Sequence, residues 1–276
     1  MNVFNLEDVN ESIKMEFQKI LSEGLITTLY QPIINLQNAS ILGYEALSRG
    51  PKESLLSSPL VMLSIAELLD KTWELERLMR VNALKNATFT DKHLLFLNVD
   101  PNVVNDSKFK SGFTKENLKK LNIPSSSIVI ELTERSAIKC YADFKNVLRH
   151  YTDQGYSVAI DDTGTGYSGL KTLYELYPEY MKIDMDFVRN VDTDKLKQTI
   201  VKSLINIAEA ANAKTVAEGI ETEDELKTLI RLGINYGQGY YIQKPIDKPV
   251  HLKEGILDII EKEKKLSQKR KCSELF

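Results

Sequence analysis

Cysteine is scarce in this chain. Among 276 residues only Cys140 and Cys272 occur, and neither stands in a CxxC or Cys/His grouping. Two cysteines cannot build the disulfide framework of a secreted scaffold, and without neighbouring ligands they provide no zinc site. The composition therefore favours a reducing compartment, and we expect the protein in the cytoplasm.

Long apolar runs and an excess of positive charge are also missing. No apolar stretch approaches the roughly 20 residues that cross a bilayer, and the amino terminus MNVFNLEDVNE has acids where a signal peptide has basic residues. Lys and Arg number 36 against 39 Asp and Glu, which gives a net charge of −3. Proteins held on DNA by backbone charge are cationic, so we expect neither a membrane segment nor DNA binding.

Short β-rich apolar runs recur along the chain, and most are separated by longer stretches with helical spacing. That spacing is clear in Leu196, Ile200, Leu204 and Ile207. The alternation is typical of an α/β barrel or an open α/β sheet. Eight runs, a number that suits a closed barrel, lie at residues 29–36, 41–47, 94–99, 127–132, 157–161, 180–184, 214–218 and 236–241.

The connection between the first two runs is unusually short. Residues 37–40 are all that separates them. A parallel pair of strands needs a crossover of about a dozen residues or more. We therefore predict that the first two strands are antiparallel.

The two ends of the chain differ from its middle. We expect residues 1–24 to form a helix that packs on the barrel and closes its bottom, because Phe17 and Ile20 belong to an apolar stripe. Residues 25–250 are expected to form the barrel. Residues 251–276 become heavily charged, which is typical of a solvated terminal helix and equally of a helical linker to another module.

Polar side chains of the kind that bind metals stand in or directly after the predicted strands. They are Glu45, Asn98, Glu131, Asp161, Asp162 and Glu218. The carboxyl ends of barrel strands open into one mouth, so these side chains are expected to converge there. Converging carboxylates repel one another unless cations neutralise them. Their oxygen donors predict two Mg²⁺ or Mn²⁺ ions, an arrangement that recurs in phosphate-ester cleavage.

Three more polar residues stand near the predicted mouth. Lys182, in the sixth strand, could orient or deprotonate an attacking water, and Gln238 could hold that water through its amide. Arg49 has the fork geometry for a phosphate. Taken singly, an acid at a strand end is more often a helix cap or a surface charge, an Asp-Asp pair is compatible with turn chemistry alone, and a lone Arg is more often a surface ion-pair partner. Their coincidence at successive strand ends favours a site.

Several blocks of the sequence resemble the EAL-domain family of cyclic di-GMP phosphodiesterases. The block YEALSRG at residues 44–50 is similar to the signature that names the family. The other similar blocks are YQPI (30–33), LNVDP (97–101), IELTER (130–135), IDDTGTGYSGL (160–170), KID (182–184), VAEGIE (216–221) and GQGYYIQKPI (237–246). The resemblance thus extends over nearly the whole predicted barrel.

The resemblance implies a modified TIM (β/α)₈ barrel whose first strand is antiparallel to the rest, which agrees with the short connection. It also assigns expected roles. The implied catalytic residues are Lys182, Glu45 and Gln238; the substrate contacts are Gln31, Leu47 and Arg49; the ligands of two Mg²⁺ or Mn²⁺ ions are Glu45, Asn98, Glu131, Asp161, Asp162 and Glu218; and the supporting residues near them are Glu134, Glu221 and Thr163.

The implied reaction is hydrolysis of one phosphodiester bond of cyclic di-GMP, a bacterial second messenger, to linear pGpG. A non-catalytic cyclic di-GMP receptor or interaction module is the alternative within the family, although every acidic position is filled here. A barrel lyase or enolase-like enzyme is a further alternative, because such enzymes also place acids and a lysine at strand ends. Family members commonly form homodimers and are often fused to GGDEF, PAS or CBS signalling modules.

The loop after the fifth strand departs from the family's usual DDFGTGYSSL. Thr163 stands where Phe is common, and Gly169 stands where Ser is common. In this family the loop couples dimerisation to metal binding. Loss of an aromatic anchor and an added glycine therefore predict altered regulation or rate, with the metal ligands intact.

Overall fold

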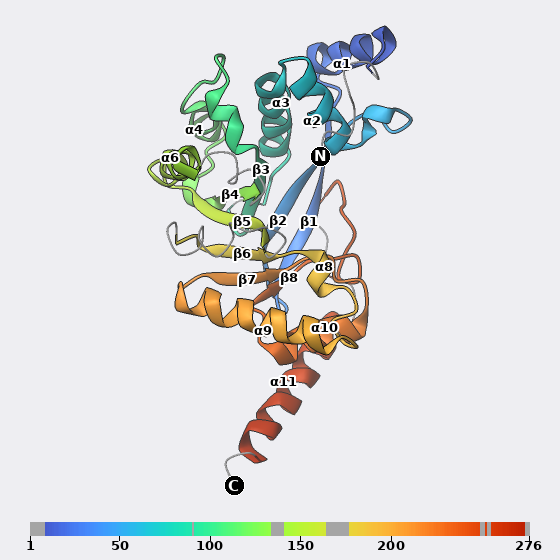
Figure 1. Ribbon diagram of the computed structural model, residues 1–276, viewed down its shortest axis with the longest axis vertical. Helices are drawn as coiled ribbons and strands as arrows, with labels where there is room; N and C mark the ends of the chain where they lie inside the picture. Colours follow the sequence, from blue (N-terminus) through green and yellow to red (C-terminus); the bar gives the residue numbers. More distant parts are fainter. Residues whose placement is uncertain are drawn as a thin grey trace.

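A computed structural model of the chain describes residues 9–89, 91–133, 141–163, 177–248, 252 and 255–273. Within these residues eight strands close into a barrel in which neighbours in sequence are neighbours in the sheet (Figure 1). The strands are β1 (Thr27–Asn35), β2 (Ile41–Arg49), β3 (Leu94–Val99), β4 (Ile128–Thr133), β5 (Ser157–Thr163), β6 (Tyr180–Ile183), β7 (Lys214–Ala217) and β8 (Tyr236–Gly237). The predicted closed α/β barrel is confirmed.

Strand β1 runs against both of its neighbours. It is antiparallel to β2, with Thr27 opposite Arg49, and antiparallel to β8, while the other neighbouring pairs are parallel. In the tight turn between β1 and β2 the Asn35 side chain accepts a hydrogen bond from the backbone N–H of Gln37 at 2.7 Å. The predicted antiparallel first pair is confirmed, and the reason is that four residues cannot span a crossover.

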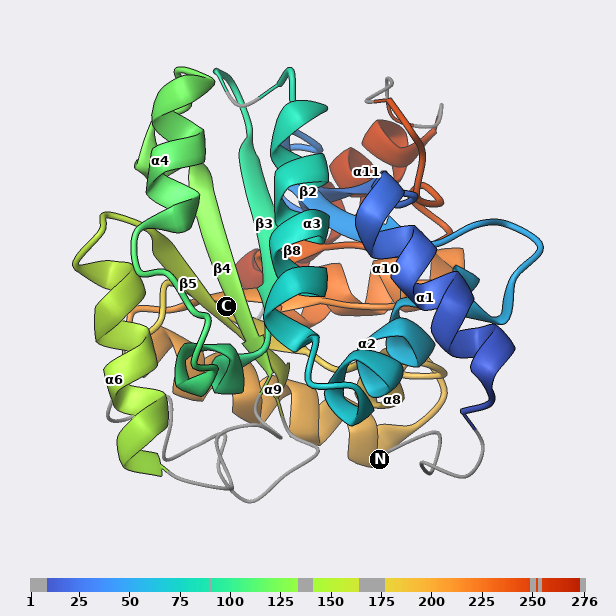
Figure 2. The same ribbon diagram turned by 90° about the horizontal axis from the view of Figure 1, so that it is seen from above.

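Helices surround the barrel (Figure 2). They are α1 (Glu11–Glu23), α2 (Pro59–Leu68), α3 (Thr72–Lys85), α4 (Phe113–Lys120), α6 (Tyr141–Thr152), α8 (Met185–Val188), α9 (Lys195–Ala210), α10 (Glu223–Leu232) and α11 (Ile256–Ser273). Helix α10 shows how the sequence sets such boundaries: Thr222 and Glu225 form a capping box at its start, and Gly233 ends it in the left-handed conformation at φ 99°. Its apolar stripe of Leu226, Leu229 and Ile230 is buried.

Helix α1 lies on a different part of the barrel from the one expected. Phe17 and Ile20 are buried in one apolar cluster with Ile26 and with residues of α2 and α3. Ile26 directly precedes Thr27, which is opposite Arg49 at the carboxyl end of β2. The expectation that this helix closes the bottom of the barrel is therefore wrong. Since β1 is antiparallel, its first residue lies at the mouth end, and the preceding helix packs beside α2 and α3 (Figure 1).

The last predicted strand is shorter than expected. Strand β8 ends at Gly237, whereas the apolar pattern predicts a strand to residue 241. Beyond it the chain is bonded to the connection that follows β7: Ile220 donates to the Gln238 carbonyl at 3.1 Å, and Tyr241 donates to the Ile220 carbonyl at 2.9 Å. These bonds to a neighbouring connection replace a strand ladder.

The carboxyl-terminal residues form helix α11. Its first turns pack on the barrel, with Ile256 and Ile260 buried and Glu263 accepting two hydrogen bonds from Arg231 at 2.7 and 2.9 Å. The later turns extend away from the barrel (Figure 1). None of the described helices combines the length and apolar character that crossing a bilayer requires.

Candidate active site

The mouth of the barrel holds one lysine surrounded by four carboxylates. The Nζ atom of Lys182 lies 2.7 Å from Glu218, 2.8 Å from Glu131, 3.2 Å from Asp161 and 3.5 Å from Glu45. We call these five residues the Lys182 cluster. They come from five strands or strand ends between residues 45 and 218, so only the closed barrel brings them together.

Strand periodicity explains why these side chains share the mouth. Side chains two residues apart in a strand lie on the same face. The interior of the barrel is filled by apolar and aromatic side chains, and a polar residue follows each of them by two positions toward the mouth. The pairs are Phe96 and Asn98, Val129 and Glu131, Ala159 and Asp161, Tyr180 and Lys182, Val216 and Glu218, and Tyr236 and Gln238.

Strand β5 contains an irregularity at the site. Ile160 pairs with Met181 and Thr163 pairs with Ile183, so β5 has one residue more than β6 over this stretch. A bulge of this kind interrupts the alternation of side chains and is common beside active sites. It falls on Asp161 and Asp162; Asp161 belongs to the Lys182 cluster, and the side chain of Asp162 lies outside the described part of the structure.

Amide side chains hold Glu45 in place. Asn98 donates to Glu45 Oε1 at 2.7 Å, and Gln238 donates to Glu45 Oε2 at 2.5 Å. Gln31 accepts a bond from Gln238 at 3.4 Å and itself donates to the Gln243 carbonyl at 3.1 Å. Three amides predicted from sequence to belong to the site therefore contact the Lys182 cluster or one another.

Burial and mutual repulsion shift the pKa values of the cluster in different directions. Burial raises the pKa of Glu131 and of Glu218 well above the usual range, helped by the charges of Glu45 and Asp161 respectively. Burial raises the pKa of Glu45, but the charge of Lys182 and the hydrogen bonds that Glu45 accepts lower it by more, so the pKa is lowered overall. Burial opposes the charge of Lys182, but the surrounding acids raise its pKa well above normal. The lysine therefore stays protonated in this arrangement.

The donor set of the cluster fits a hard divalent cation. Four acids share one ammonium group, and Oε2 of Glu131 and the amide oxygen of Gln238 are buried without a hydrogen bond from the described residues. Oxygen ligands with excess negative charge are what Mg²⁺ and Mn²⁺ prefer. Among the described residues no three acidic, histidine or cysteine side chains already have the spacing of a metal site, and the ammonium of Lys182 stands between the carboxylates.

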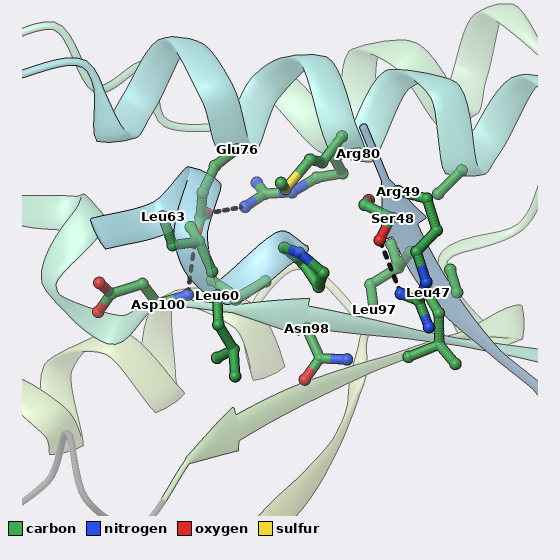
Figure 3. A pocket seen from close by; sticks show the side chains of 15 residues that line it. Leu47, Ser48, Arg49, Leu60, Leu63, Glu76, Arg80, Leu97, Asn98 and Asp100 are labelled. Atoms are coloured by element: carbon green, nitrogen blue, oxygen red, sulfur yellow. Dashed lines mark hydrogen bonds and ion pairs between the residues drawn. The ribbon is translucent and has the colours of Figure 1, made fainter. Parts of the chain in front are cut away.

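A cavity of about 320 Å³ adjoins the cluster between β2, β3 and helices α2 and α3. Its lining includes Leu47, Arg49 and Asn98 (Figure 3). Arg49 donates to the Ser48 carbonyl at 2.7 Å and is half-buried. Asn98 lines this cavity and also donates to Glu45, so the cavity lies beside the Lys182 cluster.

Sequence reasoning missed two charged residues of this cavity. Glu76 and Arg80 on α3 are 6% and 5% exposed and lie 2.8 Å apart. Glu76 also accepts the backbone N–H of Asp100 at 2.6 Å (Figure 3), and Arg80 donates to Thr114 at 3.0 Å. We call Glu76 and Arg80 the α3 pair. The available signal was their spacing of four residues within the stripe of Trp73 and Ala83, where apolar side chains are expected.

The remaining predicted residues lie elsewhere. Glu221 forms an exposed ion pair with Arg189 at 2.8 Å and makes no described contact with the Lys182 cluster. Thr163 is buried at the end of β5, and its hydroxyl donates to the Ile160 carbonyl at 3.4 Å. Glu134 and Gly169 lie outside the described residues.

Comparison with known proteins shows the family. The EAL domain profile matches residues 14–245. The chain is also 32% identical over 251 residues to the probable cyclic di-GMP phosphodiesterase PdeI of Escherichia coli K12, an alignment that covers 87% of this chain and 32% of that protein. The chain therefore belongs to the EAL domain family, and it spans about a third of the length of this relative.

Solved structures of EAL proteins have the same fold. A standalone EAL protein from Vibrio cholerae O395, in its c-di-GMP-bound form, is 29% identical with a TM-score of 0.73, covering 84% of this chain and 97% of that one. The manganese and cy-diGMP complex of BlrP1 from Klebsiella pneumoniae is also 29% identical with a TM-score of 0.73, covering 80% and 56%. The predicted modified TIM barrel and the predicted family are confirmed.

Proposed function

We propose that this chain hydrolyses one phosphodiester bond of cyclic di-GMP and releases linear pGpG. The observation that carries the proposal is the Lys182 cluster, in which four acids from four strands or strand ends meet with more negative charge than one lysine balances. Its relatives are named for this activity or were solved with cyclic di-GMP, which supports the same substrate. Family membership also disfavours the lyase alternative.

Divalent cations are part of the proposal. The residues that would hold two Mg²⁺ or Mn²⁺ ions are Glu45, Asn98, Glu131, Asp161, Asp162 and Glu218. Bound cations of this kind lower the pKa of a water molecule and neutralise charge on a phosphodiester. Asp161 and Glu218 are 12% and 15% exposed at their side chains, whereas Glu131 is fully buried, so cations would enter past the first two.

The chain's own residues would orient the reactants. Lys182 would orient the attacking water and stabilise negative charge, because its Nζ atom lies within 3.5 Å of four of the residues that would hold the cations. Gln238 has an amide oxygen without a hydrogen-bond partner in the described structure, and this oxygen can accept one from that water. Asn98 and Gln238 would hold the carboxylate of Glu45 in position to bind a cation.

The cavity would receive one end of the dinucleotide. Its volume of about 320 Å³ is at the lower end of known ligand pockets, and its lining combines apolar side chains with a few polar groups. Arg49 would donate to a phosphate, and Leu47 and Gln31 would contact the substrate beside it. Glu134, Glu221 and Thr163 would support the surrounding connections.

The test is chromatography of nucleotides after incubation of the protein with cyclic di-GMP, with Mg²⁺, with Mn²⁺ and with chelator. We expect metal-dependent pGpG, reduced at least roughly 100-fold in Glu45→Ala because a metal ligand is lost. Glu116→Ala, which removes an exposed acid on α4, is the matched control and should behave as wild type. Intact substrate with measurable binding would instead support the alternative of a non-catalytic receptor.

We also propose a cellular setting. The protein would act in the bacterial cytoplasm as a homodimer that lowers the level of cyclic di-GMP. Because the chain spans only part of PdeI, α11 is a candidate connection to a further signalling module. Sedimentation of the purified chain would test the dimer.

A further inference from the structure

The connection that carries Glu218 is packed against the segment that follows Lys182. Residues 218–222 join β7 to α10, and residues 184–190 contain α8 (Figure 1). Gly219 has a φ of 66°, and a Cβ atom there would lie 2.6 Å from the Cβ atom of Met185. The two segments are therefore in direct contact, and only glycine fits between them.

Glu225 joins these two segments through one buried carboxylate. Its Oε2 atom accepts the backbone N–H of Thr222 at 3.0 Å, as a capping box requires, and also the N–H of Glu221 at 2.9 Å. Its Oε1 atom accepts the N–H of Asn190 at 2.8 Å, which is 35 residues away in sequence. Glu225 is 3% exposed. A capping box needs only the bond from Thr222, so the bonds from Glu221 and Asn190 are additional, and the one from Asn190 links the two segments.

The other contacts between the two segments are weaker or local. Arg189 and Glu221 form an ion pair at 2.8 Å, but both side chains are 46% exposed, and such pairs contribute little. Lys197 donates to the carbonyls of Asp186 and Arg189, which ties the α8 segment to α9 and leaves residues 218–222 untouched. The buried carboxylate is therefore the strongest polar link between the segments.

We propose that Glu225 is a positioning residue for the active site: by bonding residues 221 and 222 to Asn190, it holds Glu218 facing Lys182. Glu218 is three residues before Glu221, and its N–H bonds the Ile183 carbonyl at 3.1 Å, next to Lys182. A change in the distance between the segments is thereby transmitted to both charged residues. The catalytic part of this inference rests on the proposed function.

The test compares Glu225→Gln with Thr222→Ala. A glutamine has one accepting oxygen, so it can keep the two bonds from residues 221 and 222 while its NH₂ group faces the N–H of Asn190. Thr222→Ala removes the hydroxyl of the cap and leaves the three bonds to the Glu225 carboxylate. The first variant weakens the link between segments, and the second weakens only the helix end.

We expect Glu225→Gln to keep a melting temperature near that of wild type, to bind Mn²⁺ roughly tenfold more weakly in calorimetric titration, and to lose roughly tenfold in kcat with KM nearly unchanged. Amide exchange should accelerate at Asn190 and at Glu218. Thr222→Ala should lower the melting temperature and leave these readouts at the wild-type level.

Unchanged amide exchange at Glu218 in Glu225→Gln would overturn the proposal, and so would equal effects of the two variants on Mn²⁺ affinity and kcat. If wild-type protein produces no pGpG, the proposed function fails, but the exchange measurement still decides whether Glu225 holds Glu218.

Discussion

Two groups of buried charges lie close together in this molecule, and they are built differently. In the Lys182 cluster one cation faces four carboxylates, and Oε2 of Glu131 and the amide oxygen of Gln238 have no hydrogen bond from the described residues. In the α3 pair one cation faces one carboxylate, and both have a further partner, the N–H of Asp100 for Glu76 and the hydroxyl of Thr114 for Arg80.

The difference indicates what each group is for. A buried ion pair with equal and opposite charges, in which both groups are hydrogen-bonded, is a stable part of a core. Removing one partner leaves the other charge buried without compensation, which destabilises the folded protein. A group with more carboxylates than cations favours the arrival of further cations, because the added positive charge relieves the repulsion between the acids. This comparison supports the proposal that the reaction takes place at the Lys182 cluster, whereas the α3 pair forms part of the wall of the cavity.

Removal of the lysine should give the largest effect. We expect Lys182→Met to lower kcat by roughly 10²–10⁴, because the group that orients the water and stabilises charge is lost. The measurement is the rate of pGpG formation with Mn²⁺ at saturating cyclic di-GMP.

The control is Lys119→Met, which removes an exposed lysine from α4 and should retain full activity. If Lys182→Met hydrolyses cyclic di-GMP at the wild-type rate, the cluster is a structural ion pair like the α3 pair, and the contrast drawn above is wrong.

Removal of the arginine from the α3 pair should act on stability. We expect Arg80→Met to lower the free energy of unfolding by about 3–5 kcal/mol, since Glu76 is left buried without its cation. Urea unfolding measures this loss. The double variant Glu76→Gln with Arg80→Met should recover part of it, and kcat per folded molecule should fall less than in Lys182→Met. A double variant that is less stable than Arg80→Met would contradict the assignment.

The α3 pair should also give a smaller, pH-dependent effect. Burial raises the pKa of Glu76 to about 7, against the opposing charge of Arg80. Between these two pKa values, the carboxyl of Glu76 is protonated in the folded protein and ionised in the unfolded chain. The protonated carboxyl therefore stabilises the folded state fully below about pH 4.5, and this stabilisation is lost as the pH rises toward 7. We expect the stability of wild type relative to Glu76→Gln to fall by about 2 kcal/mol from pH 5 to pH 8.

Urea unfolding of both proteins at pH 5, 6, 7 and 8 would measure this difference. A difference that stays constant over the range would mean that Glu76 is ionised throughout, and that Arg80 and Asp100 stabilise its charge fully.

Local sequence patterns were enough to predict much of the fold. The four-residue connection was enough to predict the antiparallel first pair, because a short connection depends only on neighbours in sequence. The end of β8 and the location of α1 were missed. Both depend on contacts with distant segments, the connection after β7 in one case and helices α2 and α3 in the other.

The sequence predicted which residues lie at the mouth of the barrel, but not the distances between them. Glu45, Glu131, Asp161, Lys182 and Glu218 could be predicted because strands of a barrel end at one mouth and alternate with period two. Glu76 and Arg80 were missed because a salt bridge on a helix is usually exposed, and only tertiary packing buries it.

The sequence by itself determined the barrel, the antiparallel first pair and the polar residues at the strand ends, since these follow from periodicity and from the length of one connection. Only the tertiary structure decided which charged groups contact one another. One lysine lies within 3.5 Å of four acids, Glu76 pairs with Arg80, and Glu225 accepts a bond from Asn190. Each contact depends on the distance between groups that are far apart in the chain or buried by other elements. Electrostatic interactions depend on those distances and on burial, which local patterns do not contain.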